Sequence, residues 1–237
     1  MSRARNIGKK ILAGIRLLLI SWLVFSIGSV LLMRWVDPWT SAFMLRDRGI
    51  ALFSGDDSYH FSHQWADWNQ ISGQIKVAVM ASEDQTFPSH YGFDFSAMQK
   101  AWQQNRRGRR LRGGSTISQQ VAKNLYLWPG TSYVRKGIEA YLTVLIETCW
   151  PKRRILEIYL NSAEFGKGVF GVEAASRRFF NKPAAKLSTS EAALLAAVLP
   201  APKRYLVNRP SAYVKARQAW ITRQMARLGG TATLQTL

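Results

Sequence analysis

The chain has 237 residues, enough for one domain with a hydrophobic core or for two small ones. A hydrophobic content of 47% with only 14 acidic residues excludes a typical disordered protein. The formal charge of +19 requires an anionic partner or environment, and the single cysteine excludes an intramolecular disulfide and a multi-cysteine metal site.

The amino-terminal segment predicts a membrane anchor. Residues 17–33 carry no charge, and residues 11–15 extend the apolar run beyond Arg16. Seventeen helical residues at ~1.5 Å each span roughly 26 Å, close to the hydrocarbon thickness of a bilayer. The alternative is a cleavable signal peptide, but the run is long for one and no small-x-small cleavage site follows it.

The charges flanking this segment predict its orientation. Five basic residues precede the charge-free run at 17–33: Arg3, Arg5, Lys9, Lys10 and Arg16. We therefore expect the amino terminus in the cytoplasm and the rest of the chain on the outer, periplasmic side of the cytoplasmic (inner) membrane. Such an exported domain argues against nucleic acid as the anionic partner and favours membrane lipids. The predicted organisation is a basic tail (1–10), an anchor (11–35), a connector (36–70) and a folded domain (71–230).

The folded domain is expected to be mainly α. The connector shows signals for one short strand or hairpin at most, whereas the pattern from Ile71 onward is helical. A first helix begins at Ser72 or Gly73 and ends at Glu83. Further helices are predicted over residues 95–105, 116–125 with Ser115 or Thr116 as the cap, 134–148, 152–161, 191–199 with Ser190 as the cap, and 212–228.

A basic run, residues 106–112, separates the second of these helices from a Gly-Gly turn at 113–114. It is either a solvated loop or a segment attracted to lipid phosphates. The turn leads into hydroxyls, amides and Lys123, a composition typical of phosphate binding. Two glutamates add candidate acid–base groups: Glu83 ends an apolar run, and Glu139 follows Arg135 by one helical turn. The alternative for each glutamate is a solvated or salt-bridged helix residue.

Four motifs in one order resemble those of the peptidoglycan glycosyltransferases, which polymerise lipid II. They are Glu83-Asp84-Gln85-x-Phe87-x-x-His90-x-Gly92-x-Asp94, Gly113-Gly114-Ser115-Thr116-Ile117-Ser118-Gln119-Gln120-x-x-Lys123-Asn124, Arg135-Lys136-x-x-Glu139-Ala140 and Ile155-Leu156-Glu157-x-Tyr159-Leu160-Asn161-x-x-x-Phe165-Gly166. The resemblance covers roughly residues 70–205 and is strongest to the monofunctional biosynthetic transglycosylases. The same domain occurs in class A penicillin-binding proteins.

The resemblance implies a lysozyme-like, mainly helical fold and transfer of a growing glycan chain from undecaprenyl pyrophosphate onto lipid II. It implies that Glu83 is the general base and that Glu139 is the second catalytic carboxylate. The remaining matched residues would bind substrate and pyrophosphate: Gly114, Ser115, Thr116, Gln119, Gln120, Lys123, Arg135 and Lys136. Glu139 would hold the neighbouring cations or a divalent ion, Mg²⁺ or Mn²⁺; no residue is assigned as a certain metal ligand.

The sequence departs from the family pattern at Thr131, where family members commonly carry a basic residue. Pyrophosphate binding is therefore expected to depend more heavily on Lys123 and Arg135. Two alternatives stay open: a membrane-anchored, lysozyme-like enzyme that cleaves glycans, and a non-catalytic cell-wall scaffold. The chain lacks a Ser-x-x-Lys transpeptidase motif, so cross-linking is expected from partner transpeptidases and other cell-wall synthesis proteins.

Overall fold

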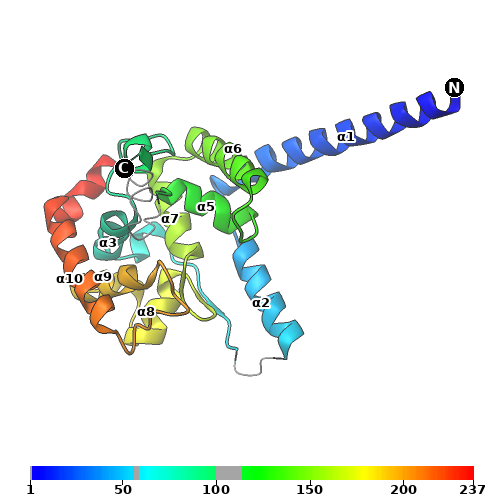
Figure 1. Ribbon diagram of the computed structural model, residues 1–237. Helices are drawn as coiled ribbons and strands as arrows, with labels where there is room; N and C mark the ends of the chain where they lie inside the picture. The colour runs from blue at the N-terminus through cyan, green and yellow to red at the C-terminus, as the bar shows by residue number, and fades with distance from the viewer. Residues whose placement is uncertain (1, 56–58, 100–113) are drawn as a thin grey trace. The chain divides into compact units, whose positions relative to one another are not determined.

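The computed structural model describes residues 2–55, 59–99 and 114–237 (Figure 1). The chain forms two compact units, residues 1–37 and 38–237. The whole basic run at 106–112, the first glycine of the Gly-Gly turn at 113 and the second half of the predicted helix over 95–105 lie outside the described residues. Residues 95–99 are helical, as predicted.

The first unit is the helix α1, Ser2–Met33. Its segment Gly8–Met33 has a mean hydropathy of 2.2 and is long and apolar enough to cross a membrane. Large apolar side chains such as Leu18 and Phe25 are exposed along it, as expected for a helix whose natural surroundings are apolar. The helix contains the predicted anchor and begins earlier than the apolar run, because no proline interrupts the chain before Pro38.

The second unit opens with a helix that the sequence interpretation missed. In place of a short strand or hairpin alone, the connector contains α2, Ala42–Ser54. Ser41 caps it by accepting a hydrogen bond from the Met44 backbone, and Gly55 ends it in the left-handed conformation. The pattern was difficult to recognise because three charged residues and Gly49 interrupt its apolar spacing.

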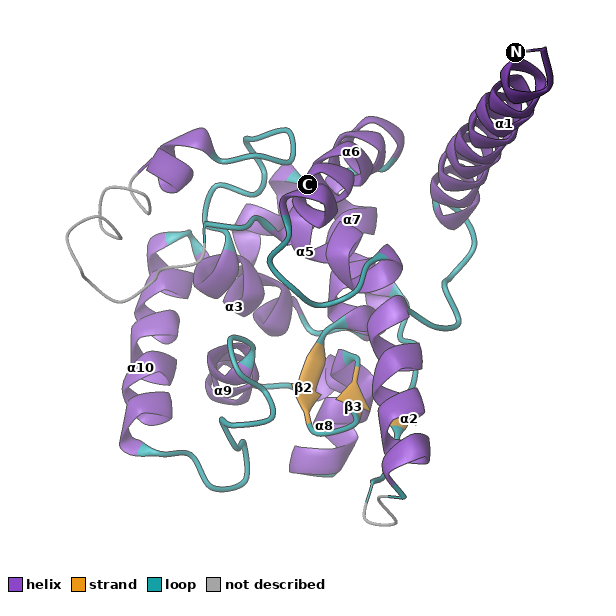
Figure 2. Cartoon of the chain, turned by 45° about the vertical axis from the view of Figure 1, so that its right-hand side comes forward, coloured by secondary structure: helices purple, strands orange, loops and turns teal. Residues whose placement is uncertain are grey.

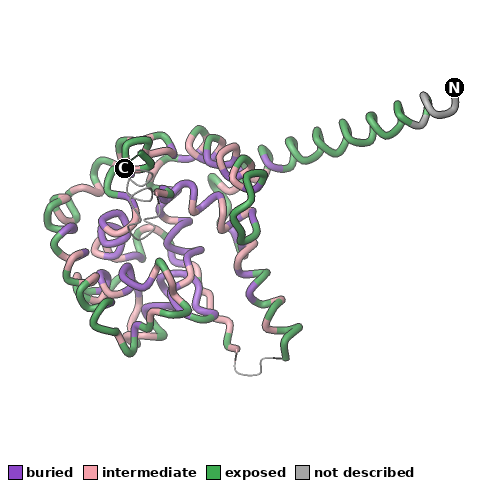
Figure 3. Tube along the Cα trace, viewed as in Figure 1, coloured by how far each residue is buried: buried purple, intermediate pink, exposed green. Residues whose placement is uncertain are grey.

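Two groups of helices surround the core. In one group, α3 (Gly73–Glu83) packs against α9 (Thr189–Val198) and α10 (Ala212–Arg227), as Figure 2 shows. In the other, α5 (Ile117–Tyr126) packs against α6 (Tyr133–Cys149) and α7 (Lys152–Ser162). Buried residues gather along the inward sides of these helices (Figure 3). The mainly α prediction is confirmed.

Local capping chemistry explains where these helices begin. Ser72 and Thr116 cap α3 and α5, as predicted. The predicted cap of α9 at Ser190 is wrong, because Ser188 caps this helix. Ser188 and Glu191 form a capping box in which each side chain accepts a hydrogen bond from the other's backbone, and the helix begins two residues earlier than expected.

A small sheet and the helix α8 (Val172–Phe180) complete the domain. One strand of the sheet lies in the connector, where a short strand was expected, whereas the other two strands and α8 were not predicted. The strands β1 (Ser62–His63), β2 (Glu164–Gly166) and β3 (Val169–Phe170) lie in the order β1-β3-β2, with β1 parallel and β2 antiparallel to β3. Three short 3₁₀ helices lie at η1 (Trp68–Gln70), η2 (Ala184–Lys186) and η3 (Gly230–Thr236). Gly168 turns the chain between β2 and β3 at φ +73°, where a Cβ atom would lie 2.5 Å from the His60 carbonyl oxygen.

Candidate active site

Glu83 lies at the last position of α3, separated by Ser82 from the buried segment Ile75–Ala81. Its side chain is 14% exposed, so it is largely desolvated and still open to a ligand. The Gln120 amide donates a hydrogen bond of 3.1 Å to Glu83 Oε2, and the Tyr159 hydroxyl in turn donates to Gln120 Oε1 at 3.2 Å. Burial raises the pKa of Glu83 against the opposing effect of these polar neighbours. A carboxylate in this environment is suited to accept a proton.

Asp84 and His90 hold the turn after α3 in place. Asp84 Oδ2 accepts a hydrogen bond of 3.0 Å from the Ile117 backbone at the start of α5 and lies 2.9 Å from His90 Nε2. His90 Nδ1 accepts from the Gly92 backbone at 3.1 Å. These contacts tie the end of α3 to the start of α5, which fixes the position of Glu83 relative to α5.

Four of the residues predicted to contact substrate lie at the start of α5 or just before it. Thr116 and Gln119 are buried and form a capping box with each other. Their side chains therefore stabilise the start of α5 by hydrogen bonds within the protein. Ser115 is exposed and Gly114 partly exposed, so these two positions remain accessible at its surface.

A cluster of charges occupies the first two turns of α6. Glu139 is 3% exposed, and its carboxylate accepts hydrogen bonds from Arg135 Nη1 at 2.7 Å and from Lys136 Nζ. The spacings of four and three residues place all three side chains on one helix face. Arg135 is buried with its partner, whereas the Lys136 side chain is 43% exposed. Glu139 thus neutralises part of the positive charge of its neighbours and orients it.

Lys123 differs from these cations because it forms no ion pair with any described residue. It lies one turn after Gln120 on α5, and its ammonium is 5.4 Å from the centre of the Phe43 ring of α2. Burial lowers the pKa of Lys123, and the negative charges of Glu139 and Glu83 oppose that shift. The structure therefore brings Lys123 within electrostatic reach of both Glu83 and Glu139, and among the described residues Lys123 differs from Arg135 and Lys136 in forming no ion pair.

The described residues do not form a metal site at Glu139. Its two carboxylate oxygens are engaged by Arg135 and Lys136. Within the described ranges, no group of three or more His, Cys, Asp and Glu side chains could hold a metal ion. We therefore derive no chemical step through Mg²⁺ or Mn²⁺.

Comparisons with known proteins place this arrangement in a family. The model described as Transglycosylase matches residues 52–226, more than half of the chain. The chain belongs to the transglycosylase family. Similar proteins, each named "Biosynthetic peptidoglycan transglycosylase", occur in Cronobacter sakazakii (61% identity over 190 residues, 80% of this chain and 79% of the relative) and Pasteurella multocida (57% over 208 residues, 88% and 85%). A third, from Citrobacter koseri, is 55% identical over 224 residues, 92% of this chain and 93% of the relative.

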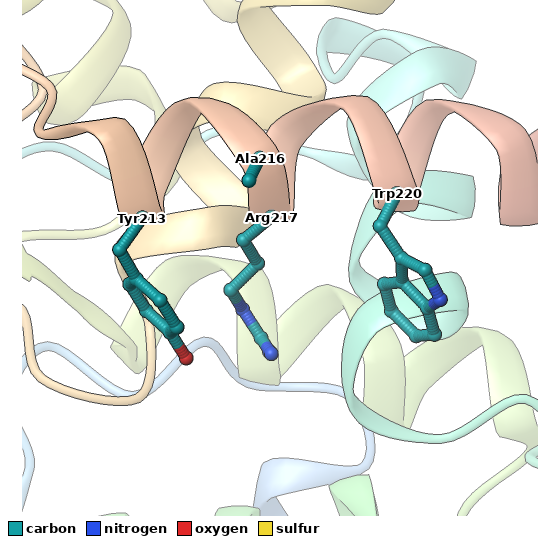
Figure 4. A pocket seen from close by; sticks show the side chains of 4 residues that line it. All are labelled: Tyr213, Ala216, Arg217 and Trp220. Atoms are coloured by element: carbon teal, nitrogen blue, oxygen red, sulfur yellow. The ribbon is translucent and has the colours of Figure 1, made fainter.

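The transglycosylase domain adds a residue that the sequence interpretation did not select. Arg217 of α10 lies with Nη2 3.4 Å from Glu83 Oε1. A pocket of about 220 Å³ opens beside it, lined also by Tyr213, Ala216 and Trp220. Figure 4 shows Tyr213, Arg217 and Trp220 projecting from the same side of α10. The sequence signal was their helical spacing of four and three residues, which alone did not reveal that this face turns toward Glu83.

Proposed function

We propose that this chain polymerises lipid II into β-1,4-linked glycan strands by an inverting displacement of undecaprenyl pyrophosphate. Membership of the transglycosylase family and the names of its relatives support peptidoglycan glycosyl transfer. One observation carries the mechanism: the same site contains a desolvated carboxylate, Glu83, and the ammonium of Lys123, which forms no ion pair with a described residue. A base for the acceptor and a cation for an anionic leaving group are the two groups that this reaction requires.

In the proposed step, Glu83 takes the proton of the acceptor sugar's 4-hydroxyl group. The oxygen attacks C1 of the donor sugar as the bond from C1 to the pyrophosphate oxygen breaks, and the electron pair of that bond leaves with the pyrophosphate. Attack opposite the leaving group converts the α-linked donor into a β-linked product. Lys123 stabilises the charge that develops on the pyrophosphate, with Arg135 and Lys136 contributing beside Glu139.

The amino-terminal helix supports a membrane site for this reaction. The helix α1 is long and apolar enough to span a bilayer, and a lipid-linked substrate is held at the membrane surface. The basic residues that precede the apolar run orient the proposed anchor with its amino terminus in the cytoplasm and the transglycosylase domain on the periplasmic side. Accessibility of the domain to an added protease in intact spheroplasts tests this orientation.

The test of the proposed function supplies lipid II to the full-length protein in detergent and follows glycan polymer by gel electrophoresis. We expect polymer from the wild type and a loss of at least two orders of magnitude in rate for Glu83→Gln, because general base catalysis contributes roughly 10²–10⁴-fold. Release of fragments from preformed peptidoglycan without polymerisation would instead identify a glycan-cleaving enzyme. Full activity of Glu83→Gln would show that Glu83 is not the base.

A further inference from the structure

The two oxygens of the Glu83 carboxylate are held by different parts of the chain. Oε2 accepts a hydrogen bond from Gln120 of α5, and Oε1 faces Arg217 of α10 at 3.4 Å. Arg217 follows Glu83 by 134 residues, so only the packing of α10 against α3 brings the two together. The Ser82 hydroxyl, 3.5 Å from Oε1, is the remaining polar neighbour within hydrogen-bond distance.

Other charged and titratable groups near Glu83 are committed to different partners. Asp84 is engaged by His90 and by the start of α5. Tyr159 of α7 reaches Glu83 only through the Gln120 amide. Lys123 of α5 acts on Glu83 through space, without an ion pair. Among the described residues, Arg217 is therefore the only cation in ion-pair contact with this carboxylate.

The guanidinium of Arg217 lies beside Glu83 and forms no ion pair with another described carboxylate. Its side chain is 22% exposed, and Glu83 is the one described carboxylate with which it forms an ion pair. Its Nε atom is buried and has no hydrogen-bond partner among the described residues. Arg217 also lines the pocket formed with Tyr213, Ala216 and Trp220, so its side chain borders an open space as well as Glu83. These contacts indicate that Arg217 holds the Glu83 carboxylate in place, which an ordinary ion pair on the protein surface would not do.

We propose that Arg217 is a positioning residue for Glu83: it holds Oε1 in place and stabilises the charged form of the carboxylate that accepts the proton. This inference rests on the proposed role of Glu83 as the general base. The surroundings act on the carboxylate in opposite directions, because burial raises the pKa of Glu83 and the charge of Arg217 lowers it.

The sign of the effect follows from the charges. Arg217 lowers the pKa of Glu83, so its removal allows that pKa to rise further. A neighbouring arginine shifts a carboxyl pKa by about one unit or more. The acidic limb of the pH–kcat profile should therefore move to higher pH by about one unit, and kcat on that limb should fall about tenfold. At pH values above the new limb, kcat should recover except for what is lost through poorer orientation.

The experiment measures lipid II polymerisation between pH 5 and 9 for the wild type, Arg217→Gln, Arg217→Lys and Arg223→Gln. Arg223 is exposed on the same helix and serves as the matched control. We expect Arg217→Gln to shift the acidic limb upward, Arg217→Lys to restore most of the wild-type profile, and Arg223→Gln to leave the profile unchanged. KM for lipid II should change less than kcat, because Arg217 acts through Glu83.

Two results would overturn the proposal. One is an Arg217→Gln profile that is lowered equally at all pH values with no movement of the limb, as a merely structural role predicts. The other is an Arg217→Lys variant no better than Arg217→Gln although both unfold at the wild-type temperature. Glu83→Gln, assayed in parallel, separates the two hypotheses: if it is inactive and the Arg217 limb does not move, only the positioning role fails. If it is active, the proposed base itself fails.

Discussion

Replacing Lys123 by methionine removes the one cation of the candidate site that no described side chain neutralises. Methionine keeps the unbranched apolar stem that packs beside Phe43 and deletes only the charge. Arg135 and Lys136 form ion pairs with the carboxylate of Glu139, which partly cancels their charge toward a pyrophosphate, whereas Lys123 forms no ion pair with a described residue. Thr131 contributes no further positive charge. We therefore expect the catalytic loss from this single change to be large.

The expected loss of kcat follows from the proposed role of Lys123 in stabilising the charge on the leaving group. Removing one preorganised group that stabilises transition-state charge costs about 10²–10³ in kcat, equivalent to about 3–4 kcal/mol. The thermal stability of the protein, in contrast, should not fall with this substitution. The pKa of Lys123 is below its usual value of 10.5 in the folded protein, so burial of the ammonium opposes folding at neutral pH. Lys123→Met should unfold at a temperature equal to or above that of the wild type, and its advantage should shrink as the pH approaches 10.5.

The assay combines initial rates of lipid II polymerisation with thermal unfolding between pH 7 and 10.5. Lys215→Met is the matched control, since Lys215 is exposed on α10 and outside the site. We expect Lys215→Met to retain the wild-type rate. A Lys123→Met variant that polymerises at near the wild-type rate would refute the assignment of Lys123 to the leaving group. A variant that loses both activity and stability would refute the argument that its ammonium is an unpaired, functional charge.

Two further predictions concern the other carboxylates. Glu139→Gln should lower the unfolding free energy by about 3 kcal/mol, because buried Arg135 loses its counter-charge. The same change should move the alkaline limb of the pH–activity profile to lower pH, because Lys123 loses a neighbour that raises its pKa. An unchanged alkaline limb would contradict this second effect. Burial raises the pKa of Glu164 to about 7 from 4.5, so the folded state binds more protons than the unfolded state between these values and stability falls as pH rises through this window. Glu164→Gln should therefore be more stable than the wild type above pH 7, by up to about 3 kcal/mol. Urea titrations of both proteins at pH 5 and pH 8 measure this difference in unfolding free energy. The same difference at both pH values would contradict the proposed titration of Glu164.

Most of the helical framework could be predicted from local sequence. The charge-free run at 17–33, the serine and threonine caps and the apolar spacing identify α1, α3, α5, α6, α7 and α10 because each signal acts within a few residues. The order of the motifs also indicated the family that the comparisons then established. The helix α2 and the strands β2 and β3 were missed because their patterns are short or interrupted and their stability comes from contacts with distant residues.

The sequence by itself determined which groups are available: a carboxylate after an apolar helix, a lysine one turn after a glutamine, and a glutamate spaced to meet two cations. Only the tertiary structure decided how they divide the work. The packing of α10 on α3 brings Arg217 to Glu83, and the approach of α5 brings Gln120 to the same carboxylate. It also leaves Lys123 without an ion-pair partner among the described residues, while Glu139 holds Arg135. Charges and desolvation act through space, so partners more than a hundred residues apart can set a pKa that no local pattern reveals.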